Sequence, residues 1–128
     1  MVLLLDTHIL LWALGSPQRL PRDIVAQIAS PETTVYFSAA NIWEIAIKTA
    51  LGKIDFPYSP EDIAQAATDT GFVELPVSAA HGAKVAHLPL HHRDPFDRIL
   101  IAQALLMPAQ LLTADSALMP YSELVRRV

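Results

Sequence analysis

The 128-residue sequence contains no cysteine and only four glycines. The absence of cysteine excludes disulfides and thiolate metal sites. The glycines form neither a P-loop nor a GxGxxG fingerprint, so nothing indicates a nucleotide cofactor. HExxH and CxxC zinc motifs are also missing. These absences leave the carboxylates as the most informative polar residues of the chain.

Long apolar runs are missing too. None approaches the roughly 20 residues that a membrane helix needs, because Asp6 and His8 interrupt the N-terminal run. That run also lacks the basic region and small-residue cleavage site of a signal peptide. A hydrophobic fraction of 52% with 17% charged residues is typical of a globular chain. We therefore expect a single cytoplasmic domain over residues 1–128, with no membrane segment.

Basic residues are few: 9 lysines and arginines face 13 acidic residues, which gives a formal net charge of −4. Taken alone, this balance argues against a protein that binds nucleic acid by neutralising phosphates. The argument weakens if some of the acids hold cations, since two divalent ions would bring the net charge to zero. Net charge therefore does not decide the class of function.

What the sequence does contain is an alternation of strand-like and helix-like segments. Apolar, β-rich stretches predict strands at residues 2–5, 34–37, 72–75 and 110–113, and an edge strand at 123–128. Helical spacing and capping residues predict helices at residues 8–14, from 21, 39–51, 60–70, 79–86 and 96–106, with loops at 56–60 and 87–95. This alternation predicts one α/β domain with a parallel sheet covered on both faces.

Asp6 is the first candidate for a functional residue. It ends a run of four apolar residues, 2–5, that reads as a fully buried strand. Open α/β sheets carry their functional groups at the carboxyl ends of the strands. A structural alternative is that Asp6 only caps the following helix. Its position directly behind a buried strand favours a role in a site.

Glu44 lies in a helix that is otherwise almost entirely apolar. Its spacing from Asn41 and Lys48 is compatible with a solvent-exposed stripe and an i,i+4 ion pair. From spacing alone this structural interpretation is slightly favoured, and Trp43 and Ile47 are predicted to pack in the core.

Two further acids lie at element junctions. We expect Asp94 to cap the helix at 96–106, and Asp97 to point from its first turn into the mouth of the sheet, although an acid there also suits the helix dipole. Asp115 follows the strand at 110–113 as Asp6 follows the first, so adjacent strand ends would bring the two together; its alternative is again a helix cap.

Three or four carboxylates at one rim would repel one another unless a cation neutralised them. Oxygen ligands favour a hard ion such as Mg²⁺ or Mn²⁺, which suits phosphodiester hydrolysis. Of the basic residues nearby, Arg98 is the one expected to touch substrate. The loop residues 91–93, His-His-Arg, are interpreted as solvated, with phosphate contact as the minor alternative.

Four segments together resemble the PIN-domain family, and within it the VapC-type toxins of bacterial toxin–antitoxin pairs. They are residues 3–8, 38–48, 94–103 and 111–115, in the order and at the spacing of that family. The resemblance implies a three-layer α/β/α sandwich with a mainly parallel sheet of four to five strands. It also implies Mg²⁺- or Mn²⁺-dependent cleavage of RNA, a homodimer, and inhibition by a separately encoded antitoxin protein.

The resemblance also implies a set of site residues. The family's acidic site maps onto Asp6, Glu44, Asp97 and Asp115, and Thr113 matches a position that supports the site by hydrogen bonding. It thus reverses the structural interpretation of Glu44. Whether one or two metals bind stays open, because Ser116 and Ala117 lack a further acid that some members carry nearby.

Two other readings compete with a ribonuclease. The first is a PIN-like binding module that acts through a partner protein or RNA without turnover, and the intact set of acids counts against it. The second is an aspartyl-phosphate phosphatase, which ranks last because Asp6-Thr7-His8 has no second acid two residues after the first.

Overall fold

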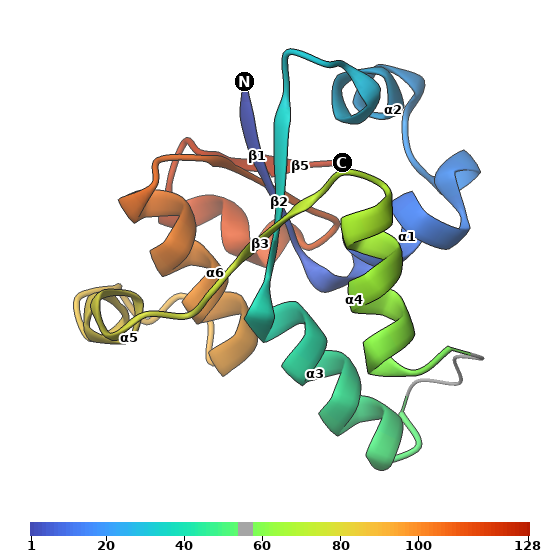
Figure 1. Ribbon diagram of the computed structural model, residues 1–128. Coiled ribbons are helices and arrows are strands. Elements are labelled where there is room, and N and C mark those ends of the chain that lie inside the picture. Colours follow the sequence, from blue (N-terminus) through green and yellow to red (C-terminus); the bar gives the residue numbers. More distant parts are fainter. Residues whose placement is uncertain (54–57) are drawn as a thin grey trace.

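The protein is built around a parallel sheet (Figure 1). The computed structural model describes residues 1–53 and 58–128, so the predicted loop at residues 56–57 lies outside the described part. Within that part the sheet has five strands, and every neighbouring pair is parallel. Their order across the sheet is β3 (Val73–Leu75), β2 (Thr34–Ser38), β1 (Val2–Leu5), β4 (Gln110–Thr113) and β5 (Val125–Arg127). The predicted α/β fold is confirmed, including the C-terminal edge strand.

Helices cover both faces of the sheet, and β1 shows why. Leu3 and Leu5 point into one apolar cluster and Leu4 into the other, and all three are fully buried. A strand buried on both faces needs an unbroken apolar run, as residues 2–5 provide. One cluster is closed by α1 (Thr7–Gly15), α2 (Arg22–Ala29), α3 (Ala39–Ala50) and α4 (Pro60–Asp69).

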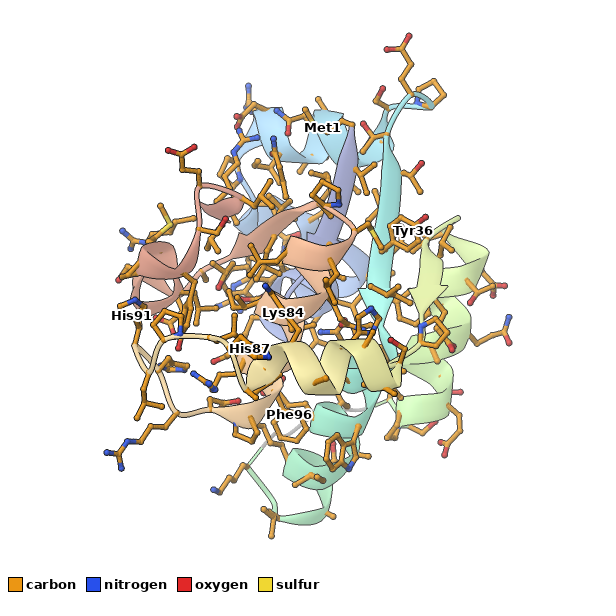
Figure 2. All side chains as sticks on the ribbon, turned by 90° about the vertical axis from the view of Figure 1, so that its left-hand side faces the viewer. Met1, Tyr36, Lys84, His87, His91 and Phe96 are labelled. Carbon is orange, nitrogen blue, oxygen red and sulfur yellow. The ribbon has the colours of Figure 1, made fainter. Side chains whose placement is uncertain are left out.

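The opposite face is covered by α6 (Pro95–Leu106) and the short 3₁₀ segment η2 (Ser116–Tyr121). The helix α5 (Ala79–Val85) packs beside α6, and Figure 2 views the molecule from the side of α5. A second 3₁₀ segment, η1 (Pro17–Arg19), joins α1 to α2. Among the described residues, no helix is both long and apolar enough to cross a membrane.

Capping side chains start three of the helices close to the edge where the functional groups gather. Asp6 accepts a hydrogen bond from the backbone of Ile9 and so caps α1 directly after β1. Ser38 ends β2 and caps α3, and Asp94 caps α6 with two accepted bonds. The predicted cap at Asp94 is therefore confirmed. Because α1 and α3 begin where their strands end, their first turns line the carboxyl edge of the sheet.

The strand order places a crevice at that same edge. The chain runs outward from β1 to β2 and β3, and then returns to the other side of β1 with β4 and β5. In open α/β sheets, such a switch point leaves a crevice at the carboxyl ends of the two strands where the order reverses. Asp6 donates its backbone N–H to the Leu112 carbonyl over 3.0 Å, which fixes the end of β1 beside the end of β4.

Candidate functional site

The crevice at the carboxyl edge is an acidic cleft with a volume of about 540 Å³. Five carboxylates line it, from Asp6, Glu44, Asp94, Asp97 and Asp115. Lys48 is the one lysine or arginine among the described lining residues, and Thr7, His8, Trp12, His92 and Ala114 complete the wall. All four acids expected from the sequence therefore lie around one cleft.

Asp6 occupies the floor of the acidic cleft and is only 6% exposed. Its Oδ1 atom accepts the Ile9 N–H over 2.9 Å, and its Oδ2 atom accepts the Thr113 hydroxyl over 2.5 Å. Burial raises the pKa of Asp6 above its ordinary value, although both hydrogen bonds act to lower it. The Asp6 side chain thus both caps α1 and lines the cleft.

Glu44 is buried rather than part of a solvent stripe. Glu44 is 5% exposed and Asn41 is fully buried, so the slight preference for an exposed stripe was wrong. The Thr7 hydroxyl donates to Glu44 Oε1 over 2.5 Å, and Asn41 Nδ2 donates to Thr7 Oγ1 over 3.1 Å. The expected i,i+4 ion pair with Lys48 does form, on Oε2 of Glu44.

Trp43 contradicts the prediction that it packs in the core, because it is 61% exposed and meets Phe96 edge-on. Neighbouring residues on a helix differ in direction by about 100°. Since α3 turns Asn41 and Glu44 inward, toward Thr7 of α1, Trp43 faces outward.

Asp97 and His92 form a second part of the site. His92 Nε2 lies 2.8 Å from Asp97 Oδ2. Burial, and next the charge of Asp94, raises the pKa of Asp97 to about 6, against the opposing effect of His92. Asp115 joins them: one ligand atom each from His92, Asp97 and Asp115 lie within 4.8 Å of one another. This trio can hold a cation through two carboxylates and one imidazole.

Asp115 is also tied to the floor of the cleft. Its backbone N–H donates to Thr113 Oγ1 over 3.0 Å, and the same hydroxyl donates to Asp6. Its own carboxylate accepts the Ala117 N–H and caps η2, so the cap named as an alternative from the sequence is present. Thr113 therefore connects the ends of β1 and β4 through one buried hydroxyl.

Arg98, expected to touch substrate, is not among the residues that line the acidic cleft. Its guanidinium donates instead to the carbonyls of Val85, Pro89 and His92 and to the Tyr121 hydroxyl. These bonds hold the loop that carries His92 against α6. Contact between Arg98 and substrate stays an untested prediction.

Among the polar residues of this site, sequence reasoning missed Thr7, Asn41, Lys48 as a cleft residue, and His92; it also missed His8 and Trp12 on the wall of the cleft. Only His92 had a signal, since its loop runs directly into the capped start of α6. The others are found through packing, because the side chains of Thr7 and Asn41 meet only when α1 and α3 lie side by side.

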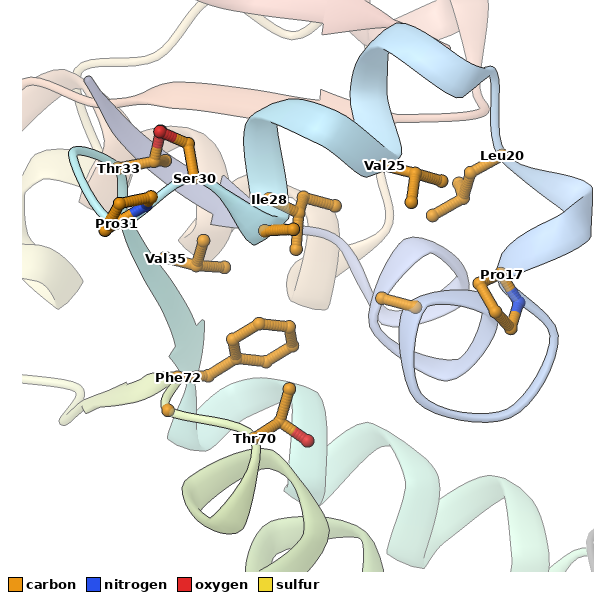
Figure 3. Close-up of a pocket in the computed structure, with 13 residues that line it drawn as sticks. Pro17, Leu20, Val25, Ile28, Ser30, Pro31, Thr33, Val35, Thr70 and Phe72 are labelled. Carbon is orange, nitrogen blue, oxygen red and sulfur yellow. The ribbon is translucent and has the colours of Figure 1, made fainter.

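A second cavity of about 610 Å³ lies elsewhere, among η1, α2, β2 and the start of β3 (Figure 3). Apolar side chains such as Leu20, Val25, Ile28 and Phe72 line it, and none of the lining residues that the structure describes is titratable. Because a catalytic or metal site needs such groups, chemistry rather than size assigns function to the acidic cleft.

The chain was compared with known proteins. A protein-family model described as PIN domain matches residues 3–122. Among solved structures, the fold is similar to VapBC2 from Rickettsia felis bound to a DNA fragment from its promoter. The TM-score is 0.69 at 14% sequence identity, and the match covers 100% of this chain and 98% of that chain. A comparison with curated protein sequences gave no match.

Proposed function

The chain belongs to the PIN-domain family, and from this premise we propose that it is a metal-dependent endoribonuclease, the toxin of a toxin–antitoxin pair. One observation carries the proposal. Four acids that are far apart in the sequence, Asp6, Glu44, Asp97 and Asp115, meet in one cleft at the switch point of the sheet. A carboxylate cluster at this place suits phosphodiester chemistry.

The residues of the acidic cleft fit a hard divalent cation. Asp6 and Asp97 both have raised pKa values, which means that burial disfavours their ionised forms when only protein groups surround them. Among the described lining residues, only Lys48 offers a permanent positive charge, and Glu44 already holds it. Mg²⁺ or Mn²⁺ held by Asp6, Glu44 and Asp97, with Asp115 or His92 completing the set, would remove this imbalance.

Each protein group then has a defined task. Thr113 and the Ile9 N–H fix both oxygens of Asp6, and Thr7 fixes one oxygen of Glu44, so the carboxylates are held in place before a cation arrives. His92 orients Asp97 in the same way. When bound, the cation stabilises the charge that develops on the phosphodiester and makes water a stronger nucleophile. If Glu44 bound the cation in place of Lys48, the Lys48 ammonium would be free to contact an RNA phosphate.

The partner proteins belong to the same proposal. The similar solved structure is a complex named VapBC2 on promoter DNA, and a likeness at 14% identity bears on the fold alone. We propose that this chain acts as a homodimer that a cognate antitoxin protein inhibits by covering the acidic cleft. RNA is the substrate in this proposal, and the chain needs no membrane.

Metal removal gives the first prediction. We expect the purified protein to cleave RNA in Mg²⁺ or Mn²⁺, to lose all cleavage in EDTA, and to regain it when either ion is restored. Mg²⁺ should also raise the unfolding temperature, because a ligand that binds only the folded state stabilises it. Cleavage that persists in EDTA would contradict metal dependence.

Thr113 gives the second prediction. Thr113→Val keeps the shape of the side chain but removes the hydroxyl that joins Asp6 to Asp115, so cleavage should fall roughly 10- to 100-fold, as for other groups that position metal ligands. Thr113→Ser restores the hydroxyl and is the matched control, with a rate close to the wild type. The measurement is kcat/KM on one RNA under saturating Mg²⁺. Equal rates for the valine and serine variants would exclude a positioning role.

A further inference from the structure

One wall of the acidic cleft is aromatic. His8 and Trp12 are four residues apart on α1, so they share one face of the helix, and both line the cleft beside Asp6. Trp12 is half-buried and its ring lies 6.2 Å from that of His8. From Asp6 to Trp12 the helix rises only about 9 Å, at roughly 1.5 Å per residue. An indole therefore lines the same cleft as the carboxylates that are proposed to hold the metal.

Arg19 lies against this indole. Its guanidinium carbon is 5.1 Å from the centre of the Trp12 ring, at the end of η1, and the side chain is exposed. A guanidinium over an indole face is a favourable cation–π contact. It restricts the ring and places one positive charge next to the aromatic wall.

The charge of the cleft makes such a wall useful. Five carboxylates line the cleft, and its lysine is paired with Glu44. RNA binding by phosphate neutralisation needs several lysines or arginines, which the described lining residues do not supply. Stacking of bases on aromatic rings is an alternative source of affinity, and it is independent of net charge and of base identity.

We propose that Trp12 is a stacking platform for an unpaired base of the RNA, with Arg19 holding the indole and approaching the adjacent phosphate. This proposal rests on the proposed ribonuclease function and adds to it the residue that receives a base beside the carboxylates of the cleft. Bases within a duplex are already stacked and paired, and RNA recognition through aromatic side chains takes unpaired bases. Duplex RNA should therefore be a poor substrate.

A purely structural role for Trp12 predicts different behaviour. Trp12 also packs against the apolar cluster on its face of the sheet, so the ring could simply fill space. In that case Trp12→Leu would change stability, and no particular base of the RNA would matter. A stacking platform instead couples one protein position to one nucleotide, and a double-mutant cycle measures such coupling.

The experiment scans an abasic nucleotide through a single-stranded RNA that the wild type cleaves. Binding to the full-length protein is measured by fluorescence anisotropy in Ca²⁺, alongside cleavage in Mg²⁺. At one position near the cleavage point, the abasic RNA should bind the wild type about 5- to 150-fold more weakly, as expected for one lost base–aromatic stack. Trp12→Leu should lose the same factor with intact RNA, and should not distinguish intact from abasic RNA at that position. Trp12→Phe should retain part of the discrimination.

Trp43 offers the matched control, since it is the second of two tryptophans, is exposed, and does not line the acidic cleft. Trp43→Leu should keep the wild-type abasic profile. In Trp43→Phe protein the remaining indole is Trp12, and RNA binding should quench its fluorescence. If Trp12→Leu binds intact RNA as the wild type does and shows the same abasic profile, the platform is refuted while the ribonuclease proposal stands. If the wild type cleaves no RNA at all, the proposed function fails and the platform with it.

Discussion

Asp6→Asn should abolish most RNA cleavage while leaving the fold intact. Metal-ion catalysis contributes several kcal/mol of charge stabilisation in the transition state. Since 1.36 kcal/mol is a factor of ten in rate, loss of this contribution corresponds to roughly a 10²- to 10³-fold fall in kcat/KM. Asparagine caps helices about as well as aspartate, so the bond from the Ile9 N–H that starts α1 is retained.

Three measurements on Asp6→Asn check this expectation: kcat/KM in Mg²⁺, the rise in unfolding temperature caused by Mg²⁺, and growth arrest on expression. The value of kcat/KM should fall by the factor given above, and the effect of Mg²⁺ on the unfolding temperature and the growth arrest should be lost, with an unchanged circular dichroism spectrum. Asp62→Asn is the charge-matched control, because Asp62 takes part in the capping of α4, as Asp6 does in that of α1, and does not line the cleft. If Asp6→Asn cleaved at the wild-type rate, the metal assignment would be wrong. If Asp6→Asn and the wild type arrested growth equally, toxicity would come from binding rather than catalysis.

The fold could be predicted because its signals are local. An apolar run ending in an acid marks β1, and a capping residue follows or ends the strand at Asp6 and at Ser38. Such pairs of signals show where strands stop and helices start, and the alternation of the two elements then restricts the sheet to parallel crossovers. Asp6 and Asp115 could be placed near one another by the same logic, since they follow β1 and β4, which are neighbours in the sheet.

The position of Glu44 could not be predicted from spacing, because it depends on the partner of its helix. With Asn41 and Lys48 at helical intervals, the pattern matched a polar outer face. In the structure α3 packs against α1, and Thr7 supplies the hydroxyl that makes burial of Glu44 tolerable. A buried carboxylate with its partners and an exposed one look identical in sequence. Only the family resemblance pointed to the site.

The predictions for Trp43 and His92 were wrong for related reasons. A tryptophan in an apolar helix suggests burial by composition, but which direction of the helix faces the core is set by the neighbouring layers. His92 was interpreted as part of a solvated loop. Its imidazole meets Asp97 because Arg98, in the helix that follows, and Tyr121, 29 residues further along the chain, hold that loop in place. Contacts of this kind are tertiary, and no period or spacing in the chain encodes them.

Asp97→Asn should make the metal-free protein more stable at pH 8 and at the same time inactive. The pKa of Asp97 rises from the ordinary 3.8 to about 6, chiefly through burial and next through Asp94, and the side chain is only 21% exposed. The folded state thus holds this proton more tightly than the unfolded state. Ionisation of Asp97 therefore costs stability above the folded pKa, and the cost disappears as pH falls toward 3.8. At about 1.36 kcal/mol for each pKa unit, less the helix-dipole benefit of an acid in the first turn, the variant should gain roughly 1–3 kcal/mol.

Urea unfolding in EDTA at pH 8, 6 and 4.5 measures this gain, which should be largest at pH 8 and small at pH 4.5. In Mg²⁺ the order should reverse, because only the wild type gains the binding free energy of the ion. Asp115→Asn is the control, because Asp115 is exposed and an asparagine can keep its capping bond. The free energy of unfolding of this variant should differ from that of the wild type by less than about 0.5 kcal/mol in the same urea series. If the two proteins had equal free energies of unfolding at pH 8, or if the difference grew toward acid pH, then Asp97 would carry no burial cost. The burial of Asp97 would then give the cleft no electrostatic need for a cation.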